Sequence, residues 1–337
     1  MDGGEFVNLR PANPTRNTND TVTIMNFNGG VFTAWNVARA RPGGTARADI
    51  NFNGGTYRPN QDNGLFGSTT DGLWNVKVDR VTLYAKGAIF DTSEQNASLD
   101  VPMGAPTGQG VSAVNFVDPG NTFVGSPFVD IIGDGTGASA YAVFDEAAKA
   151  ITEIKMTSPG NDYTWAKSII RYGTKVWTND CTLAANDAGG GIVKKGEKKL
   201  TLLAPNTYTG DTVLEEGDLV LGVADALPAE SRLVLKGGRI VVGTGVARPA
   251  FNLKLTVGET GSYPGTLTLA EGSTVYVANL DQADKAAAPY TLLEAGGPIA
   301  GTFTLANPED LPANWNVRIN ANRIRLARER GICINFR

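Results

Sequence analysis

A short strand-like pattern on both sides of a glycine corner recurs in the second half of this chain. Residues 212–222 read TVLEEGDLVLG and residues 233–243 read LVLKGGRIVVG, so that a 21-residue shift lays Val213 on Val234. A third related segment, TLTLAEGSTVYVA, spans residues 266–278. Repeats of this length with β-branched runs and almost no helical periodicity are typical of a solenoid. The pattern therefore predicts an all-β chain of stacked coils, with the strands of successive coils about 4.8 Å apart.

The corners of the two best-matched repeats carry charges of opposite sign. Under the 21-residue shift, Glu215 falls on Lys236 and Asp218 falls on Arg239. If the coils stack in register, these residues form ion pairs between neighbouring coils. Exposed ion pairs contribute only about 0–1 kcal/mol each. We expect them to matter mainly for register, because a slip of one residue would turn the buried aliphatic side chains outward.

The first part of the chain has a repeat of its own. The pentapeptide NFNGG occurs at residues 26–30 and again at residues 51–55, each time followed by a strand-like run. The 41 glycines and the many short β-branched runs also indicate strands joined by tight turns. Helical patterns are confined to two short candidates, residues 144–150 and 280–288. The basic run at residues 194–199 predicts a solvated turn.

Residues 112–172 differ from the repeats on either side. The tetrapeptides DPGN at 118–121 and SPGN at 158–161 are each followed by an aromatic residue and an aliphatic run. Proline next to glycine favours tight turns. We therefore expect a small β-rich insert whose hairpins open at these two turns. The glycine-rich run GDGTGAS at residues 133–139 matches neither a phosphate loop nor a calcium loop and is expected to be a further turn.

Residues around the first repeat match a longer motif. They are Lys195-Gly196, Leu200-Thr201-Leu202, Asn206-Thr207-Tyr208-Thr209-Gly210, Thr212-Val213 and Gly217-Asp218-Leu219-Val220-Leu221-Gly222. This motif resembles the autotransporter-associated β-strand repeat of bacterial secreted and surface passenger proteins, and residues 290–317 resemble their closing segment. Only one full copy is present, where many such proteins carry several. The resemblance implies a right-handed parallel β-helix displayed outside the cell, with a role in attachment or surface structure.

These observations divide the chain into four predicted segments. Residues 1–111 form N-terminal β-helix coils, residues 112–172 form the insert, residues 173–289 form further coils, and residues 290–337 form a closing β segment. No apolar run is long enough to predict a transmembrane helix, and no signal peptide is visible in this sequence. Location outside the cell or on its surface is therefore an expectation that rests on the resemblance.

The residue types present restrict the chemistry that the chain can perform. There is no histidine, which removes the commonest general base and metal ligand. The two cysteines, Cys181 and Cys333, lack the spacing of a zinc site and are expected to be buried apolar residues or, alternatively, a disulfide. The net charge of −4 disfavours nucleic acid as a partner. The sequence predicts no metal and no cofactor.

Carboxylates are the remaining candidates for catalysis, because right-handed β-helices also include polysaccharide lyases and glycosidases. Glycoside hydrolysis needs two carboxyl groups about 5–9.5 Å apart. The candidates are Asp130, Asp134, Asp145, Glu146 and Glu153 in the insert, and Asp211, Glu215, Glu216 and Asp218 at the repeat corner. Acidic residues at such positions are more often solvated turn residues, and charge pairing already accounts for part of the second group.

Two aromatic residues of the insert suggest a binding surface. Tyr163 and Trp165 alternate along a predicted strand, and aromatic rings placed in this way can stack on sugars. The leading hypothesis is a non-enzymatic structural or adhesive protein that presents the insert to a glycan or a protein surface. The alternatives are a carbohydrate-active β-helix that uses carboxylates and a trimeric phage fibre or spike.

Overall fold

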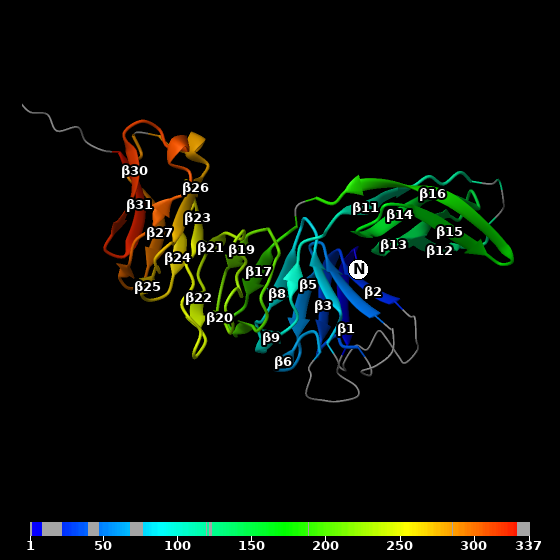
Figure 1. The fold of residues 1–337 in the computed structure, drawn as a ribbon, viewed down its shortest axis with the longest axis horizontal. Helices are drawn as coiled ribbons and strands as arrows, with labels where there is room; N and C mark the ends of the chain where they lie inside the picture. Colours follow the sequence, from blue (N-terminus) through cyan, green and yellow to red (C-terminus); the bar gives the residue numbers. More distant parts are fainter. Residues whose placement is uncertain are drawn as a thin grey trace, which may run out of the picture.

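The computed structural model describes residues 2–8, 22–39, 47–67, 77–118, 120, 123–187, 189–284 and 286–328. The molecule is elongated, with the N-terminal strands toward one end and the C-terminal strands at the other (Figure 1). Its regular structure consists of strands and two short 3₁₀ turns among these residues. The all-β prediction is confirmed.

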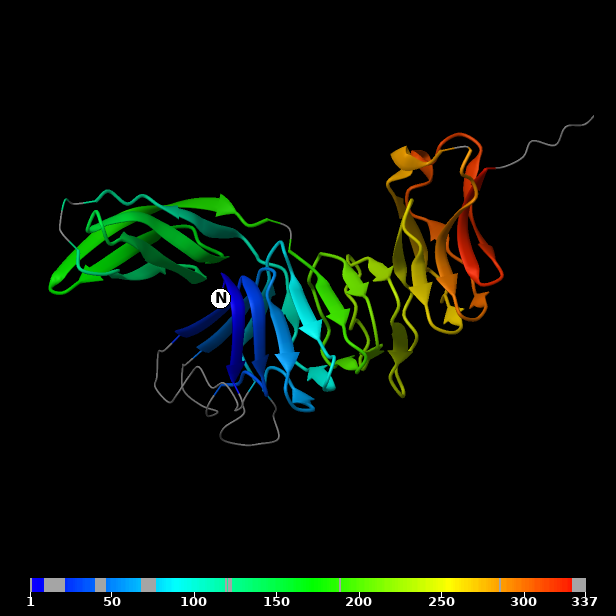
Figure 2. The same ribbon diagram turned by 180° about the vertical axis from the view of Figure 1, so that it is seen from behind.

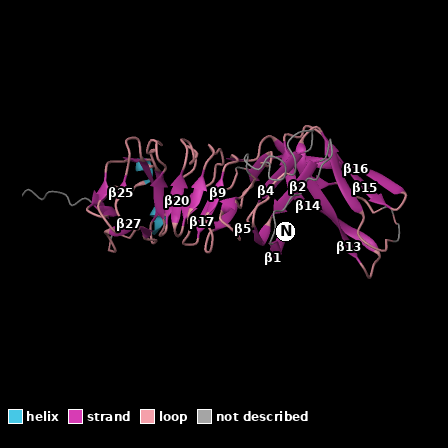
Figure 3. Cartoon of the chain, turned by 90° about the horizontal axis from the view of Figure 1, so that it is seen from below, coloured by secondary structure: helices cyan, strands magenta, loops and turns pink. Residues whose placement is uncertain are grey.

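A parallel sheet of ten strands runs along the elongated body (Figures 1 and 3). In spatial order its strands are β1 (Asp2–Asn8), β3 (Gly29–Ala34), β5 (Thr56–Pro59), β8 (Ala88–Asp91), β17 (Ile192–Lys195), β19 (Thr212–Leu214), β21 (Leu233–Leu235), β23 (Asn252–Thr256), β26 (Thr274–Ala278) and β29 (Thr304–Leu305).

Two smaller parallel sheets accompany it. One contains β6 (Asn63–Gly64), β9 (Ala97–Leu99), β18 (Leu200–Leu202), β20 (Asp218–Leu221) and β22 (Arg239–Val242), and the other contains β2 (Val22–Phe27), β4 (Arg47–Phe52), β7 (Arg80–Leu83) and β10 (Met103–Gly104). Along the chain, β8 in the ten-stranded sheet is followed by β9 and then β10 in the other two. The next strand of the ten-stranded sheet, β17, pairs directly with β8. We refer to these three sheets as the stack.

The register within the stack follows the sequence repeat. Val213 lies opposite Val234, and Leu219 lies opposite Ile240, as the 21-residue shift predicts. Strand β19 alternates buried Thr212 and Leu214 with half-buried Val213, which is the pattern of a sheet with one face on a core. The repeat therefore specifies strand pairing because one-residue slippage would expose leucines.

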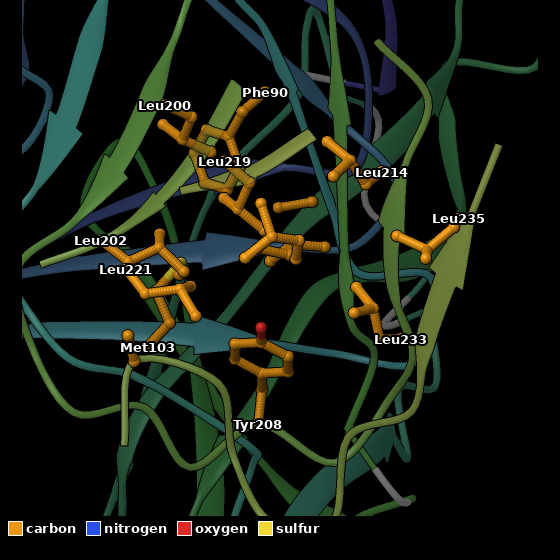
Figure 4. Packing of buried hydrophobic residues seen from close by; sticks show 14 of the residues in the cluster. Phe90, Met103, Leu200, Leu202, Tyr208, Leu214, Leu219, Leu221, Leu233 and Leu235 are labelled. Carbon is orange, nitrogen blue, oxygen red and sulfur yellow. The ribbon is translucent and has the colours of Figure 1, made fainter. Parts of the chain in front are cut away.

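The interior of the stack is a single continuous hydrophobic cluster. Leucines from successive strands point into it, and Tyr208 of the Asn-Thr-Tyr-Thr-Gly segment lies among them (Figure 4). Toward the N-terminus the same cluster becomes aromatic, and the rings of Phe27 and Phe52 stack with centroids 4.9 Å apart. Burial of this continuous apolar surface is the main source of stability for stacked strands.

Two buried tyrosines of this core differ in how their hydroxyl groups are satisfied. The Tyr208 hydroxyl lies 2.7 Å from that of Thr212, which in turn lies 2.8 Å from that of Ser231. Within the described part of the chain, the Tyr57 hydroxyl is buried without a hydrogen-bond partner. Burial raises the pKa of both phenols.

This difference predicts opposite responses to the same substitution. Tyr208→Phe should destabilise the protein by about 1 kcal/mol because it leaves buried hydroxyls with one partner fewer. Tyr57→Phe removes an unsatisfied polar atom and should leave the stability unchanged or increase it. Urea unfolding of both variants beside the parent chain measures this, and equal losses in the two variants would contradict it.

The basic run at residues 194–199 is not a fully solvated turn as predicted. Lys194 is buried, and its ammonium group donates to the main-chain carbonyls of Lys195, Gly196 and Glu216. The last of these belongs to the next corner along the stack, at 2.7 Å. Burial lowers the pKa of Lys194 to about 8. The side chain satisfies corner carbonyls that the parallel ladder leaves free, a role that charge patterning does not reveal.

The C-terminal end of the body contains antiparallel pairing. Strands β24 (Gly261–Tyr263), β27 (Tyr290–Ala295), β31 (Arg323–Arg328) and β30 (Trp315–Asn320) form one sheet, and β25 (Leu267–Thr268) pairs with β28 (Ile299–Ala300). The predicted helix at 280–288 is a 3₁₀ turn at Leu280–Gln282, and a second one lies at Pro308–Asp310. No helix in the described residues has the length and apolar character needed to cross a membrane.

Candidate functional site: the insert and its junction with the stack

The chain leaves the stack after β10 and returns at β17, and between them it forms a separate antiparallel unit. This unit contains a sheet in the order β11 (Gln109–Val114), β16 (Lys175–Ala185), β15 (Ala166–Tyr172), β12 (Phe128–Gly133), and a hairpin of β13 (Thr136–Asp145) and β14 (Ala150–Asn161). We call residues 109–185 the insert; it extends beyond the predicted range of 112–172 at both ends. Figure 2 shows it projecting from the N-terminal strands of the stack.

Two details of the insert differ from the sequence predictions. Residues 144–150, predicted as a helix, form the end of β13, a turn and the start of β14. The Asp145 carboxylate accepts hydrogen bonds from the N–H groups of Ala147 and Ala148, which favours the turn over a helix. The SPGN segment lies at the end of β14 and opens no hairpin. Pro119 and Asn121 of the DPGN segment lie outside the described residues.

The insert has its own hydrophobic interior. The sheet and the hairpin enclose a cluster that includes Phe123, Val129, Ile154 and Ile170, with Trp177 packed against it. A smaller cluster surrounds Tyr163 and Val111 of the same unit, and neither shares a residue with the cluster of the stack in the described part of the chain. The insert is therefore a separately cored module.

The module is fixed to the stack by polar contacts. The Asn26 amide donates to the Ser139 hydroxyl at 2.8 Å, and the Asn51 amide donates to the Ser158 hydroxyl at 3.1 Å. Asn28 donates to a main-chain carbonyl of β14 at 2.8 Å. These asparagines belong to the two NFNGG segments, so that the repeat supplies the docking surface for the hairpin. Uncharged hydrogen bonds of this kind fix the orientation of the module and depend little on salt.

Two hollows flank the junction. One, of about 260 Å³, is lined by Asn53, Tyr84, Pro106, Pro159, Asn186 and Asp187. The other, of about 300 Å³, is lined by Arg80, Thr82, Thr107, Asn161 and Thr207 among others. The carboxylates predicted as catalytic candidates line neither hollow, so that these concave sites do not bring a candidate acid and base together.

Some of the candidate carboxylates make local contacts, and the others are exposed to solvent. In the insert, Asp130 pairs with Arg171 at 3.6 Å, and Asp145 caps its turn. At the corner, Asp211 pairs with Lys254. Glu146, Glu153, Glu215 and Glu216 belong to exposed turns or strand faces. No group of three or more acidic or cysteine side chains suited to a metal ion occurs in the described residues.

Asp134 organises the glycine-rich run between β12 and β13. Its carboxylate accepts hydrogen bonds from the side chain and the N–H of Thr164 and from the N–H of Trp165. These bonds, the Thr164 side-chain bond first, lower its pKa to about 2. The ring of Tyr163 packs against Gly135, where a methyl group would collide with it. Only Asp134 and Gly135 of the predicted turn at residues 133–139 form a bend, because Gly133 ends β12 and residues 136–139 begin β13. Gly135 is needed for the close ring contact.

The predicted pair of stacking rings is not formed. Tyr163 is only 4% exposed, and its hydroxyl accepts a hydrogen bond from the N–H of Ala138. Trp165 is 48% exposed and offers its ring to solvent alone. The prediction was wrong for Tyr163 because it assumed a regular strand, in which side chains 163 and 165 would lie on the same face. The chain turns here instead, and β15 begins only at Ala166.

The two predicted pairs between coils have different outcomes. Arg239 donates two hydrogen bonds to Asp218, at 3.0 and 2.8 Å, between directly paired positions of β20 and β22. Glu215 and Lys236 follow directly paired residues of neighbouring strands, but no ion pair joins these two described residues. Both residues belong to a row of alternating charges that runs across the ten-stranded sheet. Earlier in this row, Asp91 forms ion pairs with Arg58 on one side and with Lys195 on the other.

Cys181 lies on β16 and is half-buried, and its thiol is free in the described part of the chain. Burial raises the pKa of the thiol to about 11, so that it stays protonated at neutral pH and is a poor nucleophile. Cys333, its partner in the alternative disulfide prediction, lies outside the described residues.

The exposed apolar residues are concentrated in the insert. Seven of the ten large hydrophobic side chains that stand exposed in the described residues belong to it: Val117, Val124, Phe128, Ile132, Tyr141, Trp165 and Val176. Sequence reasoning missed most of them, because a run such as Phe128–Ile132 is equally compatible with a strand buried on either face. Only the position of the hairpin decides which side chains face outward.

Comparisons with known proteins add no relative to these observations: no family model matches the sequence, and neither the curated proteins nor the solved structures contain a match.

Proposed function

We propose that this chain is a non-enzymatic β-helical passenger protein, secreted or displayed at a cell surface, in which a right-handed stack of coils presents the insert to a partner. The observation that carries the proposal is the concentration of exposed apolar side chains on the insert, seven of ten in the described residues. Large exposed apolar patches on a soluble protein mark interaction surfaces.

Three further features support it. Strands β5 to β10 visit the three parallel sheets in turn, as the coils of a β-helix do, and strands β17 to β22 alternate between two of these sheets. Two of the candidate carboxylates, Asp130 and Asp211, are paired with basic side chains, which favours a structural role for them over glycoside cleavage. The motif around Asn206–Gly210 resembles passenger repeats, and that resemblance is the basis for location outside the cell.

Removal of the insert tests whether the stack folds by itself and whether the insert alone is responsible for binding. The two ends of the segment that carries the insert, Ala105 and Gly189, are adjacent. A methyl group added to Gly189 would lie 2.7 Å from the Cβ of Ala105. A chain with residues 105–189 replaced by a short Gly-Ser link should keep a folded stack, because β8 already pairs with β17 and the cores are separate. Circular dichroism and urea unfolding check this.

Binding is measured with the same two proteins on glycan arrays and immobilised cell-surface proteins. The complete chain should bind at least one of these surfaces, and the folded chain without the insert should lose that binding. Equal binding by both proteins would contradict a role for the insert. Release of sugar fragments from a polysaccharide by the complete chain would contradict the non-enzymatic proposal.

A further inference from the structure

The four-stranded sheet of the insert has one face on its core and one face in solvent. Side chains that alternate with the core residues Val129 and Ile170 point away from the hairpin β13–β14. We call this solvent side the outer face. Its apolar members are Phe128, Ile132, Ile169 and Val176, of which Phe128 is 65% exposed, Val176 57% and Ile132 38%.

Strand pairing brings several of these residues together. Phe128 on β12 lies opposite Arg171 on β15, which lies opposite Val176 on β16. The apolar side chains at the two ends of this row are therefore about 10 Å apart and are bridged by the aliphatic stem of an arginine. A contiguous surface of this kind resembles the centre of a protein interface, where aromatic and arginine side chains are enriched.

The outer face carries charges of both signs in equal number. Arg171 pairs with Asp130 and Lys167 pairs with Asp180, each at 3.6 Å, and all four side chains are between 45% and 79% exposed. Exposed pairs at this distance are weak and can exchange partners at little cost. Two copies of the same face can therefore meet without net like-charge repulsion, and each arginine or lysine can find an acid across the contact.

The size of the outer face suits a dimer. Four strands at about 4.8 Å and about six residues at 3.3 Å give a footprint of roughly 20 by 20 Å. Two such faces together cover roughly 800 Å² in projection, an area typical of weak, transient contacts between proteins. We therefore expect a weak, reversible dimer that forms only as the protein concentration rises.

The side chains of the outer face disfavour a sugar or an anionic membrane as its partner. Most of its apolar side chains are aliphatic, and valine and isoleucine offer no ring for a sugar to stack on. An anionic membrane attracts an excess of basic residues, whereas this face is neutral. We propose that two copies of this chain associate through the outer faces of their inserts. The inference rests on the proposed function in that it names a second copy as the partner of the insert.

Sedimentation velocity of the full chain over a wide concentration range tests the proposal. The parent chain should shift from monomer to dimer mass, and the double variant Phe128→Glu, Val176→Glu should weaken dimerisation at least tenfold. Tyr141→Glu is the matched control, because Tyr141 is 40% exposed on the hairpin, away from the outer face, and should leave dimerisation unchanged. Circular dichroism establishes that each variant is folded.

A parent chain that stays monomeric, a trimer mass, or a double variant that dimerises like the parent would overturn the inference. A monomeric parent chain whose surface binding still requires the insert would overturn this inference alone and leave the proposed function standing.

Discussion

Replacing Gly191 by alanine should destabilise the stack by about 3 kcal/mol or more, because the added methyl group has no space. Gly191 lies where the chain re-enters the stack, and its Cβ would collide with the main-chain carbonyl of Asp211. The Gly191 carbonyl accepts a hydrogen bond from the N–H of Ala88 at 3.0 Å, so that the backbone is held on both sides. A clash with backbone on a neighbouring strand cannot be relieved by a rotamer change.

Gly125→Ala is the matched control for this prediction. Gly125 lies in the insert, and an added methyl group there would meet nothing within 4 Å. Urea unfolding followed by the far-ultraviolet signal should give a much lower midpoint for Gly191→Ala and an unchanged midpoint for Gly125→Ala. Similar midpoints for the two variants would show that the close approach at Gly191 is not needed for folding.

Replacing Asn206 by alanine should cost about 3 kcal/mol, because three hydrogen bonds among buried groups are lost together. Asn206 is 5% exposed, and its side-chain oxygen accepts a hydrogen bond from the N–H of Met103 at 2.9 Å. Its amide nitrogen donates to the carbonyls of Ala204 and Ala226, at 3.1 and 2.8 Å. One side chain thus ties its own turn to the segments that contain Met103 and Ala226.

Two comparisons sharpen the Asn206 prediction. Asn206→Asp keeps the acceptor for Met103 and removes both donated bonds, so that it should also destabilise the stack strongly. Asn53→Ala removes a single exposed contact to the N–H of Lys86 and should cost less than about 1 kcal/mol. Equal unfolding midpoints for Asn206→Ala and Asn53→Ala would rule out the bridging role of Asn206.

Much of the strand pairing of the stack could be predicted from the sequence because the paired strands are also repeats of one another. The 21-residue shift identified the partners Val213 and Val234 correctly, and it also identified the pair Asp218 and Arg239. Each of these relations joins neighbouring strands of the stack through equivalent positions of the repeat. When repeats stack in this way, the length of the repeat is also the difference in residue number between paired positions of neighbouring strands.

The polar interior contacts could not be predicted in this way. Lys194 belongs to a run of lysines that looks solvated, and only the neighbouring corner carbonyl of Glu216 explains its burial. Asn26 and Asn51 look like turn residues beside glycines, yet they dock a hairpin more than one hundred residues away. Such contacts join segments with no common period, so that no local pattern records them.

The all-β character of the chain, the repetition of its strands and the pairing of neighbouring repeats all follow from the order of its residues. Three-dimensional packing decides instead which face of each insert strand is buried, and therefore that Phe128 and Val176 are exposed. It also decides that Tyr163, in the turn before β15, is buried. This is because alternation along a strand defines two faces but not which of them meets a core. Packing of the hairpin β13–β14 against one side of the insert sheet makes that choice and leaves the other side free for a partner.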